Sequence, residues 1–317
     1  MLQCLRVCWL IRAIDVDITC DLLLEEAVLL NRDSFFDRYP IEESFKNSGL
    51  EWDTLQGIFD DYDGVKGDLR NKALLFLAEL ERDKDSRNLK IHSLNCRVKD
   101  PLHLIEKIIR KTGREHSKKY QCISTANYRE IVRDLVGIRI LVLTKEEWEI
   151  VHDWLLAFIQ ANENVSLSEV PVTYVRYGDR DVFDGKIKKK VSHKGYRSQH
   201  YVVKYKDLFV EIQVRTLAEE VYGEFDHFVK YPYRENNPFL VRYTGMASNL
   251  LNSVDELIST CVQMKETGWE LVSQYYSMDE HIDTEHIEQL ECDESADDAM
   301  PIDMKECAVS VFYRKGR

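Results

Sequence analysis

Residues 200–216, HYVVKYKDLFVEIQVRT, decide the fold, because two strand-like segments meet there across the short turn KD. Apolar and polar residues alternate along LFVEIQVRT, as they do in a strand whose two faces have different surroundings. We therefore expect an antiparallel hairpin with one face on a core. The other face is either a solvated surface or a binding surface, and it carries Glu211, Gln213 and Arg215.

The segments around this hairpin indicate the α+β class. The β-branched segment 136–143 precedes a helical stretch at 145–160 and a strand-like segment at 169–177. Helical spacing returns at 216–231 and 240–264. Adjacent antiparallel strands mixed with helices predict a mixed, mostly antiparallel β-sheet flanked by helices that cover one face, with helical N- and C-terminal extensions.

The same spacing divides the chain into parts. Two amphipathic helices are predicted within residues 52–82, and a helix beginning at Pro101 is expected to stop at Gly113. We predict an N-terminal extension over 1–50, a central domain with its flanking helices over 51–266, and an acidic, weakly ordered tail over 267–317. The apolar AVSVFY near the end is a candidate docking strand within that tail.

Composition excludes several classes of protein. With 44% hydrophobic residues in 317, the chain can bury a core, and its net charge of -13 argues against a protein that coats nucleic acid. The eight cysteines form no CxxC pair, so neither a zinc ribbon nor a disulfide framework is indicated, and we expect reduced thiols in the cytoplasm. Charges interrupt the apolar N-terminal segment before it reaches the length of a membrane span, so no membrane association is expected.

Two carboxylates are candidates for a metal site. Asp134 lies just before the segment 136–143 and Glu211 lies within the hairpin. If both meet at one edge of the sheet, they suit Mg²⁺ that also contacts nucleotide phosphates. A helix-end cap is the alternative for Asp134. Arg139 lies among apolar residues of its strand and requires a partner, which an anionic ligand would supply.

Basic residues cluster at two places. Arg97 and Lys99 precede the helix that begins at Pro101, and Lys107 and Lys111 lie within it, so these cations could contact a triphosphate, with solvated surface lysines as the alternative. The second cluster is the basic loop KIKKKVSHKGYRS over 186–198. Its tyrosine is placed as an exposed aromatic on which a base could stack, and an inert surface loop is the alternative.

Five segments in order resemble the successive motifs of the synthetase domain of the RelA/SpoT homologue family. They are RVKDPLHLIEKIIRK, RDLVGIRI, HKGYRSQHY, VEIQVRT and EFDHFVKYPY. The resemblance covers about residues 94–233. It implies a nucleotidyltransferase-like fold and an enzyme that moves the β,γ-pyrophosphate of ATP to the ribose 3′-hydroxyl of GDP or GTP, making (p)ppGpp.

The resemblance also implies roles for the residues that match the family motifs. Glu211 and Asp134 resemble the catalytic residues, and both would bind Mg²⁺. The residues that resemble the ATP-binding set are Arg97, Lys99, Lys107, Lys111 and Arg139. The residues that resemble the acceptor-binding set are Lys194, Tyr196, Arg197, His200, Gln213, Arg215, His227 and Tyr231.

Departures from the family pattern keep a second function open. Lys194 and Gln199 stand where Asn or Ser and Leu are common, and KIKKK is unusually basic. The alternative is a toxic relative that pyrophosphorylates the 3′ end of tRNA or makes adenosine alarmones, and it would bring tRNA and an antitoxin as partners. No HD-type hydrolase pattern and no TGS or ACT module is found, so a synthetase-only protein is expected, compatible with a homo-oligomer.

Overall fold

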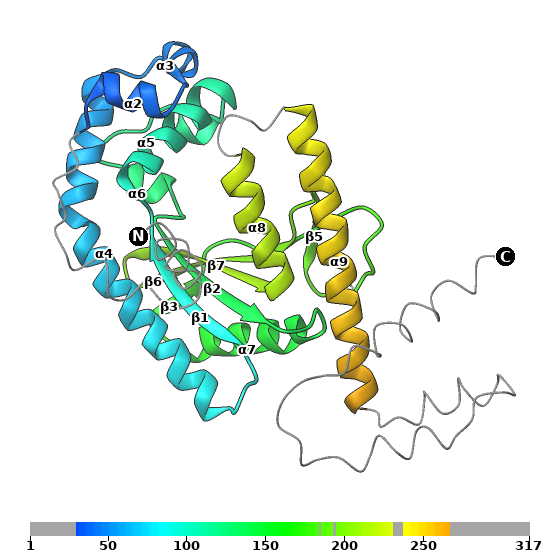
Figure 1. The fold of residues 1–317 in the computed structure, drawn as a ribbon. Coiled ribbons are helices and arrows are strands. Elements are labelled where there is room, and N and C mark those ends of the chain that lie inside the picture. Colours follow the sequence, from blue (N-terminus) through cyan, green and yellow to red (C-terminus); the bar gives the residue numbers. More distant parts are fainter. Residues whose placement is uncertain (1–29, 184, 193–194, 231–236, 267–317) are drawn as a thin grey trace, which may run out of the picture. The chain divides into compact units, whose positions relative to one another are not determined.

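The computed structural model describes residues 30–183, 185–192, 195–230 and 237–266 (Figure 1). The helices are α2 Arg32–Arg38, α3 Glu42–Ser48, α4 Trp52–Ser86, α5 Pro101–Ile109, the π-helix η1 Arg110–Arg114, the 3-10 helix η2 Lys118–Tyr120, α6 Tyr128–Ile131, α7 Glu147–Ala161, α8 Leu217–Lys230 and α9 Pro238–Glu266. The strands are β1 Ser93–Val98, β2 Val136–Val142, β3 Val165–Leu167, β4 Val172–Val175, β5 Lys188–Val191, β6 Ser198–Tyr205 and β7 Leu208–Thr216. The predicted acidic tail lies outside the described residues, and the proposed division into three parts stays a prediction.

The strands form one mixed sheet in the order β1-β2-β7-β6-β4-β5, with β3 paired to β6 beside β4. The pairs β2/β7 and β4/β5 are parallel, and the other pairs are antiparallel. The predicted hairpin is β6 and β7, and its turn uses Lys206 in a left-handed conformation with φ 55°. This confirms the α+β class with a mostly antiparallel sheet.

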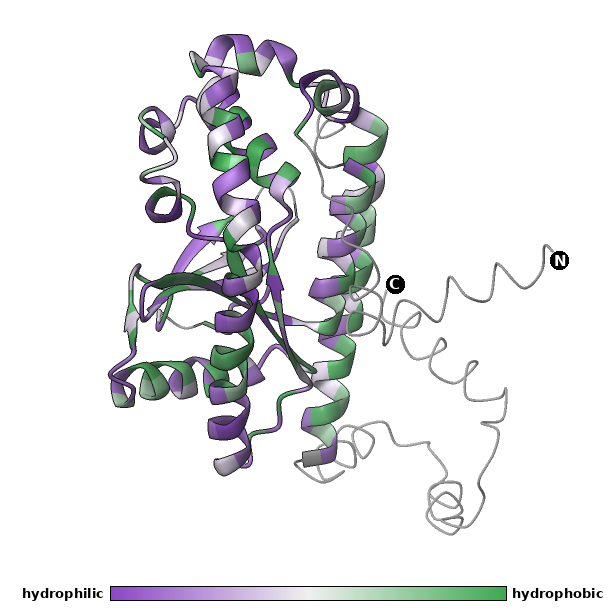
Figure 2. Ribbon diagram, turned by 90° about the vertical axis from the view of Figure 1, so that its left-hand side faces the viewer, coloured by the Kyte–Doolittle hydropathy of each residue, from purple (hydrophilic) through white to green (hydrophobic). Residues whose placement is uncertain are grey.

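The two faces of the sheet have different roles. On one face, buried residues such as Tyr201 and Tyr205 pack against α7 and α4: the Tyr201 hydroxyl lies 2.8 Å from His152 Nδ1, and Tyr205 stacks on Phe76 with ring centroids 4.6 Å apart. Figure 2 shows hydrophobic residues concentrated in α7 and in the strands above it. The opposite face is polar, and Arg139 on it contacts α8. The expectation that helices cover one face is therefore wrong, since α7 and α8 lie on opposite faces (Figure 1).

The helices also differ from the sequence prediction. Residues 52–86 form the single helix α4, although Gly64 and Gly67 lie within it, because its buried residues continue on one side from Leu55 to Leu80. Packing of that side outweighs the local cost of the glycines. No helix in the described ranges is both long enough and apolar enough to span a bilayer.

Gly113 does not stop the helix that begins at Pro101. The backbone instead continues into η1, where Gly113 is buried against α3. The described part of the predicted N-terminal extension packs into the same core, with Phe35 and Phe45 buried beside Trp52. The glycine is therefore a contact residue between two helical segments.

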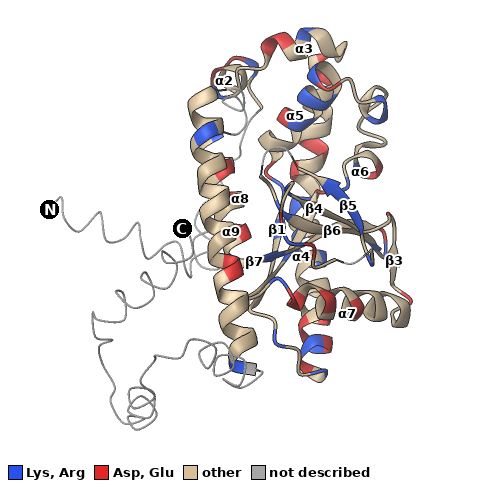
Figure 3. Ribbon diagram, turned by 90° about the vertical axis from the view of Figure 1, so that its right-hand side faces the viewer, with Lys and Arg blue, Asp and Glu red and all other residues tan. Residues whose placement is uncertain are grey.

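Three strands, β1, β3 and β5, were missed because they are short and their residues are polar or sparsely apolar. Only Leu94 of the six residues in β1 is buried. β5, which the sequence predicts as a basic loop, consists of KKKV with every residue exposed. β5 forms an edge strand on β4, and exposed lysines are common on edges because they discourage pairing with another chain. The lysines of this edge appear as a blue arrow in Figure 3.

We predict that Gly113→Ala destabilises the fold, because an added Cβ would lie 1.7 Å from the carbonyl oxygen of Ser44. Overpacking of this kind typically costs about 1–3 kcal/mol, and a backbone neighbour cannot rotate away. Urea unfolding followed by circular dichroism measures the loss. Gly64→Ala in α4, where a Cβ meets nothing within 4 Å, is the matched control and should gain about 0.5–1 kcal/mol. Equal stability of the two variants would contradict the close packing.

Candidate active site

Asp134 lies at the entrance of β2 and joins two basic side chains. Its Oδ2 lies 3.1 Å from the Nζ of Lys99, which follows β1, and 2.6 Å from the Nζ of Lys107 on α5. The backbone of Lys99 is fixed as well, since its N–H donates to Leu135 and its carbonyl accepts from Tyr62. Burial disfavours the charged carboxylate, yet the two ammonium groups outweigh burial and lower the pKa of Asp134. The group is therefore ionised at neutral pH.

The second carboxylate oxygen of Asp134 takes no part in these ion pairs. Its Oδ1 is buried and has no hydrogen-bond partner among the described residues. A buried carboxylate oxygen without a donor is costly unless a cation or water completes it. This oxygen suits a hard divalent cation that takes most of its other ligands from phosphate and water, since the described residues contain no group of three or more His, Cys, Asp or Glu that could hold a metal ion.

Glu211 on β7 is one of five side chains in a closed ring of hydrogen bonds. Its Oε1 lies 3.1 Å from His200 Nδ1, and its Oε2 accepts from Gln213 Nε2 at 2.7 Å. His200 Nε2 lies 2.9 Å from the hydroxyl of Tyr196, which accepts from Arg215 at 2.5 Å. Arg215 also donates to Gln213 Oε1 at 2.8 Å, which closes the ring. Five side chains from two adjacent strands and one loop thus hold one another in place.

The ring fixes the charge state of the carboxylate. Burial acts to raise the pKa of Glu211, but the contacts with His200 and Gln213 lower it, and the net shift of the pKa is downward. The nearby charge of Asp134 acts in the raising direction, so the two carboxylates share one electrostatic environment. Glu211 is ionised at neutral pH and can accept a hydrogen bond or a proton from a ligand hydroxyl.

Two arginines lie on the same polar face as Glu211. Arg97 on β1 is opposite Gly137 of β2, and a Cβ on that glycine would meet the Arg97 side chain at 3.4 Å. Glu211 pairs with the other side of Gly137. Arg139 follows two residues later on β2, beside Gln213. Both predicted ATP-binding arginines therefore reach the face on which Asp134 and Glu211 act.

A family model described as the region found in RelA / SpoT proteins matches residues 96–236, which contain all of these side chains. This stretch of the chain is therefore a RelA/SpoT-type domain. A curated relative, GTP pyrophosphokinase YjbM of Bacillus subtilis (strain 168), is 27% identical over 202 residues, covering 59% of this chain and 78% of that protein.

Solved structures similar to this chain include small alarmone synthetase 1 from Bacillus subtilis. It is 22% identical, covers 66% of this chain and 100% of that chain, and has a TM-score of 0.49. A GTP pyrophosphokinase family protein from Streptococcus pneumoniae is also 22% identical, with 66% and 91% covered and a TM-score of 0.45.

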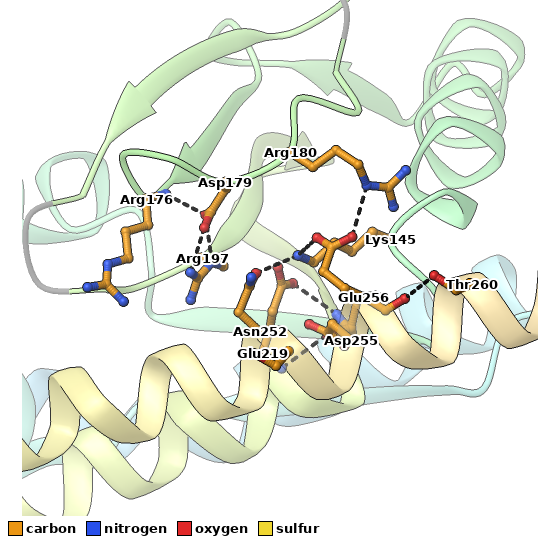
Figure 4. Close-up of polar contacts among 12 residues, drawn as sticks. Lys145, Arg176, Asp179, Arg180, Arg197, Glu219, Asn252, Asp255, Glu256 and Thr260 are labelled. Atoms are coloured by element: carbon orange, nitrogen blue, oxygen red, sulfur yellow. Dashed lines mark hydrogen bonds and ion pairs between the residues drawn. The ribbon is translucent and has the colours of Figure 1, made fainter. Parts of the chain in front are cut away.

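Several residues predicted for the RelA/SpoT site lie elsewhere. Arg197, in the loop directly before β6, is buried and forms a bidentate pair with Asp179, at 2.7 Å for both contacts (Figure 4). It also donates to Ser248 of α9. This geometry gives it a packing role, so its assignment to the acceptor is not supported by its contacts. Lys111 pairs with Glu115 rather than with Asp134.

The remaining predicted residues are placed differently. Tyr196 is half-buried rather than exposed, and the Arg215 guanidinium lies 5.0 Å from its ring centroid, which covers one face of the ring. His227 lies on α8 with an exposed side chain, and its partial desolvation lowers its pKa. Lys194 and Tyr231 lie outside the described residues.

The sequence prediction missed the acidic side of the RelA/SpoT site. Arg139 pairs with Glu220 and Glu224 of α8, although the sequence suggested an anionic ligand as its partner. The two glutamates are four residues apart, so they lie on one side of the helix, and this spacing is visible in TLAEEVYGE. It could have shown that α8 supplies carboxylates to the face.

We predict that Asp179→Asn lowers the free energy of unfolding by about 3–5 kcal/mol, because it leaves the buried Arg197 guanidinium without its charge partner. Burial opposes ionisation of Asp179, but the Arg197 hydrogen bonds lower its pKa. This contribution is therefore complete above the unfolded pKa, about 3.9, and is lost as pH falls through the folded pKa.

Urea unfolding between pH 3 and pH 7 tests it. The control, Asp207→Asn, removes an exposed ion pair with Lys72 and should cost no more than about 1 kcal/mol. A loss for Asp179→Asn that is as small as in the control would contradict the packing role of Arg197.

Proposed function

We propose that the RelA/SpoT domain transfers the β,γ-pyrophosphate of ATP to the ribose 3′-hydroxyl of GDP or GTP. The observation that carries the proposal is that one polar sheet face brings together an ionised Asp134 with an unpartnered oxygen and an ionised Glu211 held in a hydrogen-bond ring. The name of the related Bacillus subtilis protein, GTP pyrophosphokinase, supports the same class of enzyme, a pyrophosphotransferase.

The donor would lie along the edge formed by β1, β2 and α5. Arg97 and Arg139 would contact the adenine, and Lys99 and Lys107 would offset the charge of the phosphates. Asp134 would hold Mg²⁺, which neutralises phosphate charge when bound. Because Lys107 is buried, its pKa is lowered, and the charges of Asp134 and of an incoming triphosphate both favour its protonated form.

The acceptor would lie over β6 and β7. Tyr196 would stack one ring face on the guanine, and Arg215 covers the other face. Glu211 would accept the hydrogen bond of the 3′-hydroxyl and take its proton as the oxygen attacks the β-phosphorus. The bond from that phosphorus to the bridging oxygen breaks, and AMP leaves with both bonding electrons. Most of the rate enhancement would come from positioning and charge neutralisation, as in phosphoryl transfer generally.

Labelled ATP tests the proposal directly. The purified protein is incubated with γ-labelled ATP and GDP, GTP or tRNA, and both the labelled product and the nucleotide left from ATP are identified. We expect label on the guanosine nucleotide together with equimolar AMP. Formation of ADP would mean transfer of a single phosphoryl group, and label on tRNA alone would replace the proposed acceptor.

We further predict that Glu211→Gln lowers the rate of transfer by about 10²–10⁴-fold, the usual contribution of a group that handles the proton. The affinity for a non-hydrolysable ATP analogue should change by only a few-fold, because Glu211 acts on the acceptor hydroxyl. Single-turnover kinetics and calorimetry measure the two quantities. Glu163→Gln, an exposed substitution before β3, is the control with unchanged rate. A Glu211→Gln variant with the rate of this control would remove Glu211 from the mechanism.

A further inference from the structure

Glu220 of α8 contacts one arginine on the proposed donor side of the site and one on the proposed acceptor side. One of its oxygens contacts Arg139 on β2, and the other accepts from Arg215 on β7 at 2.7 Å. Its side chain is 15% exposed, so solvent competes only weakly with these contacts. A single carboxylate is thus divided between two guanidinium groups.

The sheet register explains why one side chain can reach both arginines. β2 and β7 are parallel neighbours, with Arg139 beside Gln213 and Leu141 beside Arg215. The two arginines therefore project from the same face of adjacent strands, two positions apart. α8 begins directly after β7 and lies over this face, which brings Glu220 between them.

The two arginines belong to different halves of the site. Arg139 is on the donor side, and its Nε is buried without a hydrogen-bond partner among the described residues, so its guanidinium is incompletely satisfied. Arg215 is on the acceptor side, where it holds the Tyr196 hydroxyl and Gln213. A change in the contacts of Glu220 with one of these arginines therefore also affects the other arginine.

We infer that Glu220 is a positioning residue that couples donor binding to acceptor binding, an inference that rests on the proposed function. When ATP draws Arg139 toward itself, Glu220 is released from Arg139 and both its oxygens become available to Arg215. Arg215 is then held more firmly, and with it Tyr196 and Gln213. The acceptor meets a more ordered site and binds more tightly, and the coupling is reciprocal by thermodynamic necessity.

Glu224 provides a matched control. It also pairs with Arg139, at 2.6 Å, but its side chain is 60% exposed and no contact links it to Arg215 in the described part of the chain. Glu224 would therefore compete with ATP for Arg139 without changing the contacts of Arg215 on the acceptor side. Glu224→Gln should tighten ATP binding by a few-fold and leave the coupling intact.

Calorimetry on the full chain tests the inference. The Kd of GDP is measured with and without a saturating non-hydrolysable ATP analogue, for wild type, Glu220→Gln, Glu220→Asp and Glu224→Gln. We expect the analogue to tighten GDP binding by about five-fold or more in wild type and Glu224→Gln, within the usual range of coupling between sites. The ratio of the GDP Kd without the analogue to the GDP Kd with it should fall to about one in both Glu220 variants. Gln lacks the charge, and the shorter Asp keeps the charge but spans only one arginine.

The possible results distinguish a failure of the coupling role from a failure of the proposed function. If both nucleotides bind wild type but the ratio is one, or if both Glu220 variants keep the wild-type ratio, the coupling role is wrong and the proposed function stands. If wild type binds neither nucleotide, the proposed function fails and the inference fails with it. Retention of coupling by Glu220→Asp alone would also overturn it, since charge without the bridge would then suffice.

Discussion

The parallel pairing of β2 with β7 is the constraint on which the rest of the site depends. It fixes Gly137 beside Glu211 and Arg139 beside Gln213, so residues from distant parts of the sequence share one row of the sheet. Because side chains alternate along a strand, a shift of one residue would send these polar groups into the core. The buried face, with Ile138, Ile140 and Ile212, makes such a shift prohibitive. The hydrophobic core thus sets the geometry of the polar face.

The two-residue alternation along the strands made the polar face predictable from the sequence. The side chains of other elements that contact this face could not be predicted in the same way. LFVEIQVRT and VGIRILV alternate clearly, so the hairpin, the α+β class and the orientation of Glu211 follow from the residues alone. The family resemblance was confirmed. The division into three parts and the roles of single site residues stay predictions.

The errors arise where tertiary contacts override local signals. Gly113 looks like a helix stop, but it allows α3 to approach at a distance that any side chain would forbid. KKKV at 188–191 has no apolar alternation, and it is a strand only because β4 offers an edge. Arg197 lies in a basic motif, and its partner Asp179 is a residue that no local pattern links to it, so the contact could not be foreseen from the sequence.

The distribution of charge explains how an acidic chain can present a site for polyanionic nucleotides. Four cations of the site are already paired: Lys99 and Lys107 with Asp134, and Arg139 and Arg215 with carboxylates of α8. Pairing keeps buried ammonium and guanidinium groups charged and in place without ligand. A triphosphate, with several oxygens and higher charge, can compete with single carboxylates for these groups. Binding then exchanges partners around fixed cations, and the carboxylates released in the exchange are the means by which one side of the site can act on the other.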